Sequence, residues 1–275
     1  MISILIPNKD HKSDLKKCVE SILNKSTYKN DEIIIIENNS IKNETFEYYK
    51  ELEKNDKISV VTYEDEFNYS KINNFGEKSA KGDYILLLNN DTEVINDDWM
   101  EELMMYGQRD DVAVVGAKLY YGDDTIQHAG IVIGLGADRA AGHTHYGVDR
   151  ENVGYMGRLY YAQDVSAVTG ACMLVKKSIY EDLGGLDEKF TVAFNDVDFC
   201  LKAREKGYLN VFTPYCELYH YESKSRGFED TRAKKKRFQQ EVGLFRSRWH
   251  KVIEDGDPYY NPNFSLDRSD FYIPD

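Results

Sequence analysis

Four clusters of polar side chains carry the residue types that could do chemistry in this chain. The clearest is Asn89-Asn90-Asp91, which directly follows the apolar run of residues 84–88. The other three are Pro7-Asn8, Glu37-Asn38-Asn39-Ser40 and Asn195-Asp196-Val197-Asp198. A carboxylate flanked by amides can bind a hard divalent cation such as Mg²⁺ or Mn²⁺ and leave positions open for phosphates. The same residue types also form turns and helix caps, so a purely structural role stays open for each cluster.

The elements that must position these clusters follow a regular order in the first half of the chain. Apolar runs predict strands over residues 2–6, 32–36, 58–62, 84–88 and 112–117. Helical spacing predicts helices between them, over residues 13–23, 44–54, 70–80 and 99–106. Alternating strands and helices imply a parallel sheet covered on both faces, with ligands outside the carboxyl ends of its strands. The sequence contains neither a glycine-rich dinucleotide fingerprint after the first strand nor a P-loop motif.

The second half of the chain is less regular. Residues 122–164 are glycine-rich, contain three histidines and show little periodicity, which predicts a functional loop or an irregular hairpin. A strand over 165–175, helices over 177–183 and 194–206, and short strands over 210–212 and 216–219 follow. A basic helix predicted over 232–250 repeats Phe238, Val242, Phe245 and Trp249 along one face. This aromatic face either docks the helix on the domain or approaches membrane lipid.

Composition argues against several classes of protein. The 275 residues include 48 acidic and 35 basic side chains, a net charge of −13, which opposes a nucleic-acid binder. The four cysteines form no C-x-x-C pair, so neither a zinc site nor a disulfide scaffold is indicated. No apolar run approaches the ~20 residues that cross a bilayer, and no signal-peptide pattern opens the chain. We therefore expect a globular, cytoplasmic protein.

Taken together and in order, these motifs resemble the family 2 glycosyltransferases, inverting enzymes of the GT-A fold that use nucleotide-diphosphate sugars. The resemblance runs from residue 2 to about residue 227. It implies that Pro7 and Asn8 contact the nucleoside, and that Glu37, Asn39 and Ser40 hold the base and ribose. Asn39 stands where the family carries a glycine, and Glu37 takes the position of the family's acidic residue.

The resemblance also implies a donor and metal site. The metal motif of the family corresponds to Asn89-Asn90-Asp91, with an amide in place of the first carboxylate. Asp91 would then bind Mn²⁺ or Mg²⁺, and His220 would complete the metal site. Further donor contacts are implied for residues that lie elsewhere in the chain: Lys71, Asn74, Asn89, Asn90, Gly170, Ala171 and Arg226.

In the resemblance, Asp196 is the general base, because an inverting transfer needs a carboxylate that takes the acceptor hydroxyl's proton. Asn195 and Asp198 would support it, with Asp198 either fixing geometry or binding acceptor. The glycine-rich segment would face the acceptor, with His128, His143 and His145 as sugar-binding or simple loop residues. Nothing else in the sequence supports a second metal at His143 and His145.

These observations predict an α/β protein with a GT-A-like, Rossmann-like, mostly parallel central sheet flanked by helices. We divide it into a domain of residues 1–227 and a C-terminal helix and tail of residues 228–275. Within the domain, residues 1–120 form the nucleotide-sugar half and residues 121–227 the acceptor and catalytic half.

The expected activity is transfer of a hexose from a UDP-sugar to a growing bacterial surface glycan, with dTDP-rhamnose as a second donor. The acceptor would be a polysaccharide, a glycoprotein or a lipid-linked glycan. The basic C-terminal helix could bring the protein to the inner face of the membrane, and a homo-oligomer is compatible with the sequence.

Two other functions stay open at this stage. A nucleotidyltransferase would be expected to carry a glycine-rich basic loop after the first strand, where residues 6–14 contain no glycine. A carbohydrate-binding or scaffold protein that kept the fold and lost the chemistry is allowed by Asn89, but the joint presence of Asp91, Asp196 and His220 argues against it.

Overall fold

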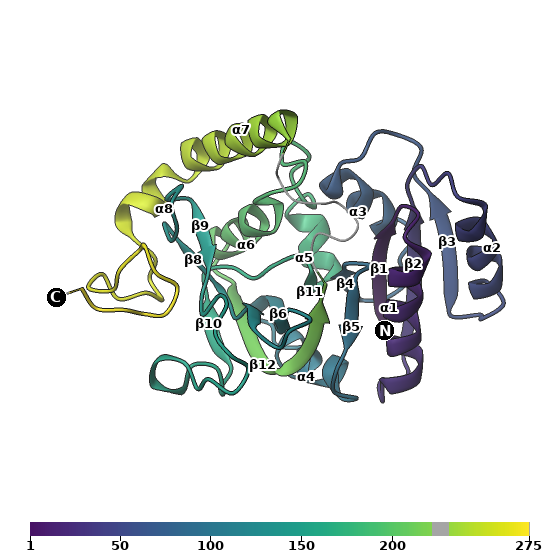
Figure 1. Cartoon of the computed structure of the whole chain (residues 1–275), viewed down its shortest axis with the longest axis horizontal. Coiled ribbons are helices and arrows are strands. Elements are labelled where there is room, and N and C mark those ends of the chain that lie inside the picture. Colours follow the sequence, from purple (N-terminus) through teal and green to yellow (C-terminus); the bar gives the residue numbers. More distant parts are fainter. Residues whose placement is uncertain (222–230, 275) are drawn as a thin grey trace.

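The first half of the chain forms the parallel part of a ten-stranded sheet (Figure 1). The computed structural model describes residues 1–221 and 231–274. β1 (Ile2–Asn8) lies between β2 (Asp31–Glu37) and β4 (Tyr84–Leu88), with β3 (Ile58–Thr62) beyond β2. All three pairings are parallel, so the carboxyl ends of these strands meet at one edge of the sheet.

The remainder of the sheet is mixed. Beyond β4 follow β11 (Cys172–Lys176), β6 (Val112–Tyr120), β12 (Leu209–His220) and β10 (Gln163–Val165). β11 is antiparallel to both of its neighbours, whereas β6 and β12 are parallel. β5 (Thr92–Val94) pairs with β12, β7 (Ile126–His128) pairs with β6, and β8 (Ile131–Ile133) and β9 (Ala141–His143) form a separate hairpin. The α/β class is confirmed, while the parallel pattern is confined to the first half and to β6 with β12.

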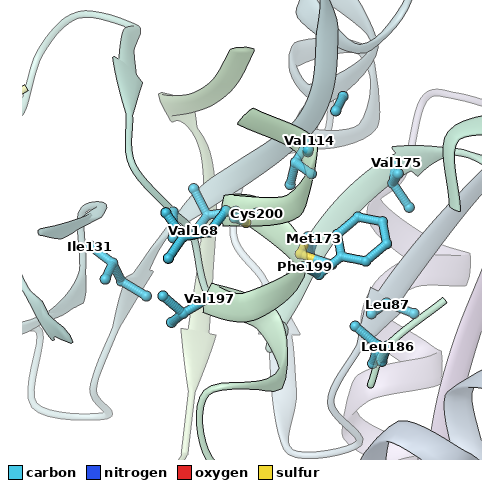
Figure 2. Packing of buried hydrophobic residues seen from close by; sticks show 14 of the residues in the cluster. Leu87, Val114, Ile131, Val168, Met173, Val175, Leu186, Val197, Phe199 and Cys200 are labelled. Carbon is cyan, nitrogen blue, oxygen red and sulfur yellow. The ribbon is translucent and has the colours of Figure 1, made fainter. Parts of the chain in front are cut away.

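Helices cover both faces of the sheet because its buried strands point alternate side chains to opposite sides. One face packs against α1 (Lys12–Lys25), α2 (Asn43–Leu52) and α4 (Trp99–Gly107). The other packs against α3 (Tyr69–Glu77), α5 (Lys177–Asp182), α6 (Asn195–Glu205) and α7 (Arg232–Arg248). Figure 2 shows this second core, where Phe199 of α6 lies against Met173 of β11. A 3₁₀ turn (Tyr155–Gly157) and α8 (His250–Asp255) complete the helical elements of the described residues.

Several element boundaries differ from the sequence prediction. β1 continues through Pro7 to Asn8. Its pairing with β4 ends at Leu5, so the missing N–H of Pro7 removes no hydrogen bond to β4. The two short strands over 210–212 and 216–219 are one strand, β12, interrupted by an irregularity between Phe212 and Glu217. The strand predicted over 165–175 is divided between β10 and β11, which belong to different parts of the sheet.

The aromatic face of the C-terminal helix docks on the domain. Val242, Phe245 and Trp249 are buried in the second core. No described helix combines the length and apolarity needed to span a bilayer. Because these side chains pack inside the protein, they are not the ones that would contact a membrane. A membrane contact of this helix through other residues stays a prediction.

Candidate active site

A cavity of about 750 Å³ opens at the carboxyl ends of β1, β2 and β4. This volume falls in the range of small-molecule sites. Its lining comes from the ends of the parallel strands, from Thr169-Gly170-Ala171, and from residues 192–197 at the start of α6. The structure brings ten of the predicted site residues to this cavity: Pro7, Asn8, Asn89, Asn90, Asp91, Gly170, Ala171, Asn195, Asp196 and His220.

At the carboxyl ends of the parallel strands, asparagine side chains form a series of hydrogen bonds. The Asn90 Nδ2 group donates to Asn8 Oδ1 at 2.6 Å, and Asn8 Nδ2 donates to the Tyr49 hydroxyl at 2.7 Å. Asn38, which also lines the cavity, donates through Nδ2 to the backbone oxygens of Tyr63 and Asp65. These bonds fix the ends of β1, β2 and β4 relative to one another.

Asp91 and His220 form the pair best suited to hold a metal ion. Antiparallel pairing of β5 with β12 sets His220 opposite Thr92, which brings the imidazole beside Asp91. The distance from His220 Nε2 to Asp91 Oδ1 is 3.3 Å, and the Asn89 Nδ2 atom lies 3.1 Å from the same ring nitrogen. Both side chains are nearly buried. A carboxylate oxygen and an imidazole nitrogen at this separation fit Mn²⁺, which could take its other ligands from a diphosphate and water.

No group of three or more His, Cys, Asp or Glu side chains in the described residues could form a closed protein cage for a metal. The donor set at Asp91 and His220 is therefore an open one. Its composition suits an ion that binds together with a phosphorylated substrate rather than a structural ion.

Asp196 also lines the cavity and lies at the start of α6. Its carboxylate accepts hydrogen bonds from the backbone N–H of Gly170 at 2.8 Å and from that of Val197, also at 2.8 Å. The side chain is half-buried and lines the cavity. The two bonds fix the orientation of the side chain, so Asp196 is held at the cavity as a hydrogen-bond acceptor.

The backbone just before Asp196 is strained, and α7 holds it in place. Phe194 has a φ of 65°, which is rare for a residue with a bulky side chain. Its ring stacks on Phe245 and Phe238 of α7, with centroid distances of 4.9 and 5.9 Å. The Glu241 carboxylate accepts the N–H of Val192 at 2.8 Å and that of Ala193 at 3.3 Å. The C-terminal helix is therefore part of the support for the Asp196 loop.

Sequence reasoning missed Glu241, although a signal was present. It is the one acidic residue among residues 232–250, and its spacing to Phe238 and Phe245 places it on the apolar face of the helix. A charged side chain on a buried face needs partners, which here are the N–H pair of the loop and Arg237, whose Nε atom lies 3.5 Å from Oε2.

The carboxylate of Glu37 forms hydrogen bonds within the protein. It accepts hydrogen bonds from the Ser40 N–H at 2.5 Å, the Ser40 hydroxyl at 2.6 Å and the Tyr49 hydroxyl at 2.5 Å. Burial, together with the bond to Glu37, raises the pKa of Tyr49. Neither Glu37 nor Ser40 is among the described residues that line the cavity. Asn38 lines it instead.

Three other predicted donor-binding residues also lie away from the lining. Asn39 has a φ of 59° and donates through its amide to Asp65 O. Lys71 is exposed on α3. Asn74 accepts hydrogen bonds from the Tyr180 hydroxyl and the Leu186 N–H, and donates to the Leu186 oxygen. Arg226 and the loop of residues 223–227 lie outside the described residues.

Asp198 points away from the cavity and joins α6 to the end of α7. It is fully buried, and its Oδ1 accepts from Arg248 at 2.7 Å and from the Trp249 indole at 3.0 Å. Lys202 lies 2.9 Å from Oδ2. Of the two roles considered for Asp198, the structure favours fixing geometry, because no part of the side chain is exposed for an acceptor.

The fold and the site define a glycosyltransferase of the GT-A type. Residues 3–184 match the model of the family described as glycosyl transferase family 2, and the chain belongs to that family. Two solved structures share its fold at low sequence identity. GalNAc-T7 with UDP, GalNAc and Mn²⁺ has a TM-score of 0.71 at 15% identity, covering 93% of this chain and 49% of that one. The mannosyltransferase PcManGT from Pyrobaculum calidifontis, with GDP-Man and Mn²⁺, has a TM-score of 0.64 at 14% identity, covering 91% and 64%.

Similar sequences occur within longer proteins. The uncharacterized protein y4gI of Sinorhizobium fredii is 46% identical over 99% of this chain, and the O-antigen biosynthesis protein RfbC of Myxococcus xanthus is 33% identical over 98%. The chain spans 30% and 20% of the lengths of these two relatives. An N-acetylglucosaminyl-diphospho-decaprenol L-rhamnosyltransferase of Mycobacterium tuberculosis is 33% identical over 63 residues, which are 23% of this chain and 20% of that protein.

Proposed function

We propose that this chain transfers a hexose from a nucleotide-diphosphate sugar of the UDP type to a hydroxyl group of a glycan, with inversion at the anomeric carbon. The observation that carries the proposal is the cavity itself. It is lined both by a carboxylate held by two backbone N–H groups, Asp196, and by the paired Asp91 and His220.

Asp196 acts as the general base. Its carboxylate takes the proton of the acceptor hydroxyl while that oxygen forms the new bond to the anomeric carbon. The bond from the anomeric carbon to the diphosphate oxygen breaks, and the diphosphate leaves with the electron pair. The N–H groups of Gly170 and Val197 hold the carboxylate in place at the cavity.

Asp91 and His220 would hold Mn²⁺ or Mg²⁺, and the ion would stabilise the negative charge of the diphosphate. Pro7, Asn8 and Asn38 lie at the ends of β1 and β2 and would bind the nucleoside. The small side chains of Gly170 and Ala171 leave room for the donor sugar. Asn89 Nδ2 lies 3.1 Å from the same His220 nitrogen that would bind the ion, so this amide would have to turn away when the ion binds and could then contact the donor.

The acceptor we propose is a growing surface glycan, on a polysaccharide, a glycoprotein or a lipid carrier. The relative named for O-antigen biosynthesis supports this class of product. dTDP-rhamnose is a second donor to test, because one relative is a rhamnosyltransferase that acts on a lipid-linked sugar.

A thermal-shift panel tests donor and metal binding together. UDP, UDP-glucose, UDP-galactose and dTDP-rhamnose are each added with and without Mn²⁺ to the wild type and to Asp91→Ala. A ligand that binds only the folded state raises the free energy of unfolding by mass action, by about 2.7 kcal/mol when its concentration is a hundred times Kd. This stabilisation is seen as an increase in Tm. We expect a Mn²⁺-dependent increase in the wild type that Asp91→Ala loses. If no nucleotide raises Tm, the transferase proposal fails.

Asp196→Asn separates catalysis from binding. It should keep the nucleotide-dependent Tm increase and lose roughly 10²–10⁴-fold in turnover of the donor that binds. Asp182→Asn, an exposed change at the end of α5, is the matched control and should behave as wild type. Nucleotide binding with no turnover in the wild type would instead favour a carbohydrate-binding or scaffold protein.

A further inference from the structure

The outward side of α7 carries cations that the fold itself does not use. Residues 232–251 contain eight Lys and Arg side chains and one acidic residue, Glu241, in a chain whose net charge is −13. Glu241 is buried, and Arg248 pairs with Asp198 inside the protein. Four exposed cations of the helix make no ion pair with any described residue: Arg232, Lys235, Lys236 and Arg246.

These four cations, which we call the basic face of α7, lie on one side of the helix. At 3.6 residues per turn, their side chains project within about 100° of one another. The residues among and beside them are exposed and uncharged: Gln239, Gln240, Gly243 and Ser247. This side of α7 therefore has no carboxylate to neutralise its charge, and no large apolar side chain to insert into lipid.

The opposite side of α7 packs on the domain and reaches the cavity. Val242, Phe245 and Trp249 are buried in the second core, and Phe238 lines the cavity. A helix with its side chains is about 10–12 Å across. A surface in contact with the basic face would therefore lie within about that distance of the cavity lining at Phe238.

The shape of the basic face favours a broad, flat partner. The cations extend from Arg232 to Arg246, about 20 Å at 1.5 Å per residue, and Figure 1 shows α7 at the outer edge of the molecule. A major groove of DNA admits a whole helix, whereas α7 is buried along one side. At physiological ionic strength, charges more than about 8 Å away are largely screened, so the acidic residues elsewhere on the chain repel an anionic surface only weakly.

We propose that the basic face of α7 binds the anionic headgroups of a membrane surface, by charge and without insertion. The proposal deepens the function proposed above and rests on it in one respect. An acceptor on a lipid carrier is the reason to expect a membrane as the partner rather than another polyanion. Binding there holds the cavity close to the surface in which such a carrier is anchored.

Vesicle co-sedimentation of the whole chain tests the proposal. The vesicles contain either equimolar phosphatidylglycerol and phosphatidylcholine or phosphatidylcholine alone. We expect binding to the anionic vesicles at about 0.1 M salt, and loss of that binding at about 1 M salt, where the Debye length falls to about 3 Å. No binding to anionic vesicles would overturn the proposal. Binding that survives the higher salt, or equal binding to neutral vesicles, would overturn it too, since both indicate insertion.

Paired lysine substitutions test which face binds. Each Lys or Arg near an anionic membrane strengthens binding roughly fivefold, so Lys235→Gln combined with Lys236→Gln should weaken it about 25-fold. Lys50→Gln combined with Lys54→Gln is the matched control, because both lysines are exposed and lie in or just after α2, which covers the other face of the sheet. This control should bind as wild type, and both pairs should keep the wild-type Tm. Equal weakening by the two pairs would show that net charge, and not the basic face, determines binding.

Two further measurements separate lipid from other anionic partners. A short DNA duplex is titrated at about 0.1 M salt, and the oligomeric state is measured by light scattering without vesicles. Tighter binding to DNA than to anionic vesicles, or self-association that the Lys235 and Lys236 substitutions abolish, would overturn the assignment to lipid. None of these assays contains a nucleotide or a metal ion, so a negative result here is distinct from a negative nucleotide panel.

Discussion

Replacing Glu241 by glutamine tests whether α7 holds the loop that carries Asp196. The Glu241 side chain is 4% exposed, and its two carboxylate oxygens accept the N–H groups of Val192 at 2.8 Å and Ala193 at 3.3 Å. A glutamine has nearly the same shape but only one acceptor oxygen. Its NH₂ group would face the Ala193 N–H and the Arg237 Nε atom, which lies 3.5 Å from Oε2, so one charge-assisted hydrogen bond and one ion pair are lost.

The expected magnitude is set by the lost hydrogen bond, to which the ion pair with Arg237 adds. A hydrogen bond to a charged group contributes about 1.5–3 kcal/mol. Because the longer, 3.3 Å bond is the one a glutamine would give up, we expect the free energy of unfolding to fall by about 2 kcal/mol. In a chain of this size, that loss lowers Tm by roughly 4–8 °C. The variant stays folded at 25 °C, where its activity can be measured.

Activity is the more specific readout. Phe194 is strained, and without the Glu241 carboxylate the adjacent loop can relax and displace Asp196. Because a shift of about 1 Å in a catalytic group can cost 10²-fold, we expect kcat to fall ~10–100-fold. The KM for the donor should change much less, because the nucleoside wall is untouched.

The assay is donor turnover with Mn²⁺ at 25 °C, together with thermal unfolding. Glu254→Gln, an exposed change on α8, removes the same charge and should alter neither Tm nor kcat. A Glu241→Gln protein with lowered Tm and wild-type kcat would refute the reasoning, since the position of Asp196 would then not depend on α7.

Three further predictions concern stability. Asp198→Ala should cost about 3–5 kcal/mol in urea unfolding, because it leaves two cations and an indole N–H without their buried partner, and a loss below about 1 kcal/mol would contradict this. His145 is buried, and this burial, with the nearby Arg158 as the second cause, lowers its pKa from an ordinary 6.5 to about 4. The unfolded chain therefore binds more protons between these values, so roughly 3 kcal/mol of stability is lost as the pH falls from 6.5 to 4, and His145→Gln should flatten that slope in unfolding measurements. Gly116→Ala should lower the free energy of unfolding by about 1–3 kcal/mol, because the added Cβ would lie 2.4 Å from the Cβ of Val168. Gly243→Ala in α7 should raise it by about 0.5–1 kcal/mol, because no atom lies within 4 Å of the added Cβ. Equal Tm values for the two variants would contradict this packing argument.

Local patterns were enough to predict most of the elements. The apolar runs of β1, β2 and β4 are visible in the sequence because a strand buried on both faces is apolar at nearly every position. The pairing of β11, which runs antiparallel between β4 and β6, leaves no comparable trace, since its residues are as apolar as those of a parallel strand. For the same reason, β10 and β11 could not be told from one continuous strand.

The candidate site divides in a similar way. The positions of Asp91 and Asp196, directly after a buried strand and at the start of a helix, follow from the residues around them. A carboxylate at the end of a strand looks the same whether it serves a ligand or the protein. Glu37 was therefore predicted at the donor, although its oxygens are bonded to Ser40 and Tyr49.

The sequence by itself determined the buried strands, the amphipathic helices and the polar strand ends, because each depends on residues only a few positions apart. Only the tertiary structure decided which of these side chains share a space. Glu241 meets the Asp196 loop across about fifty residues, and His128 meets Thr169 across about forty. Such contacts depend on how the elements pack against each other, and packing is a property of the whole chain.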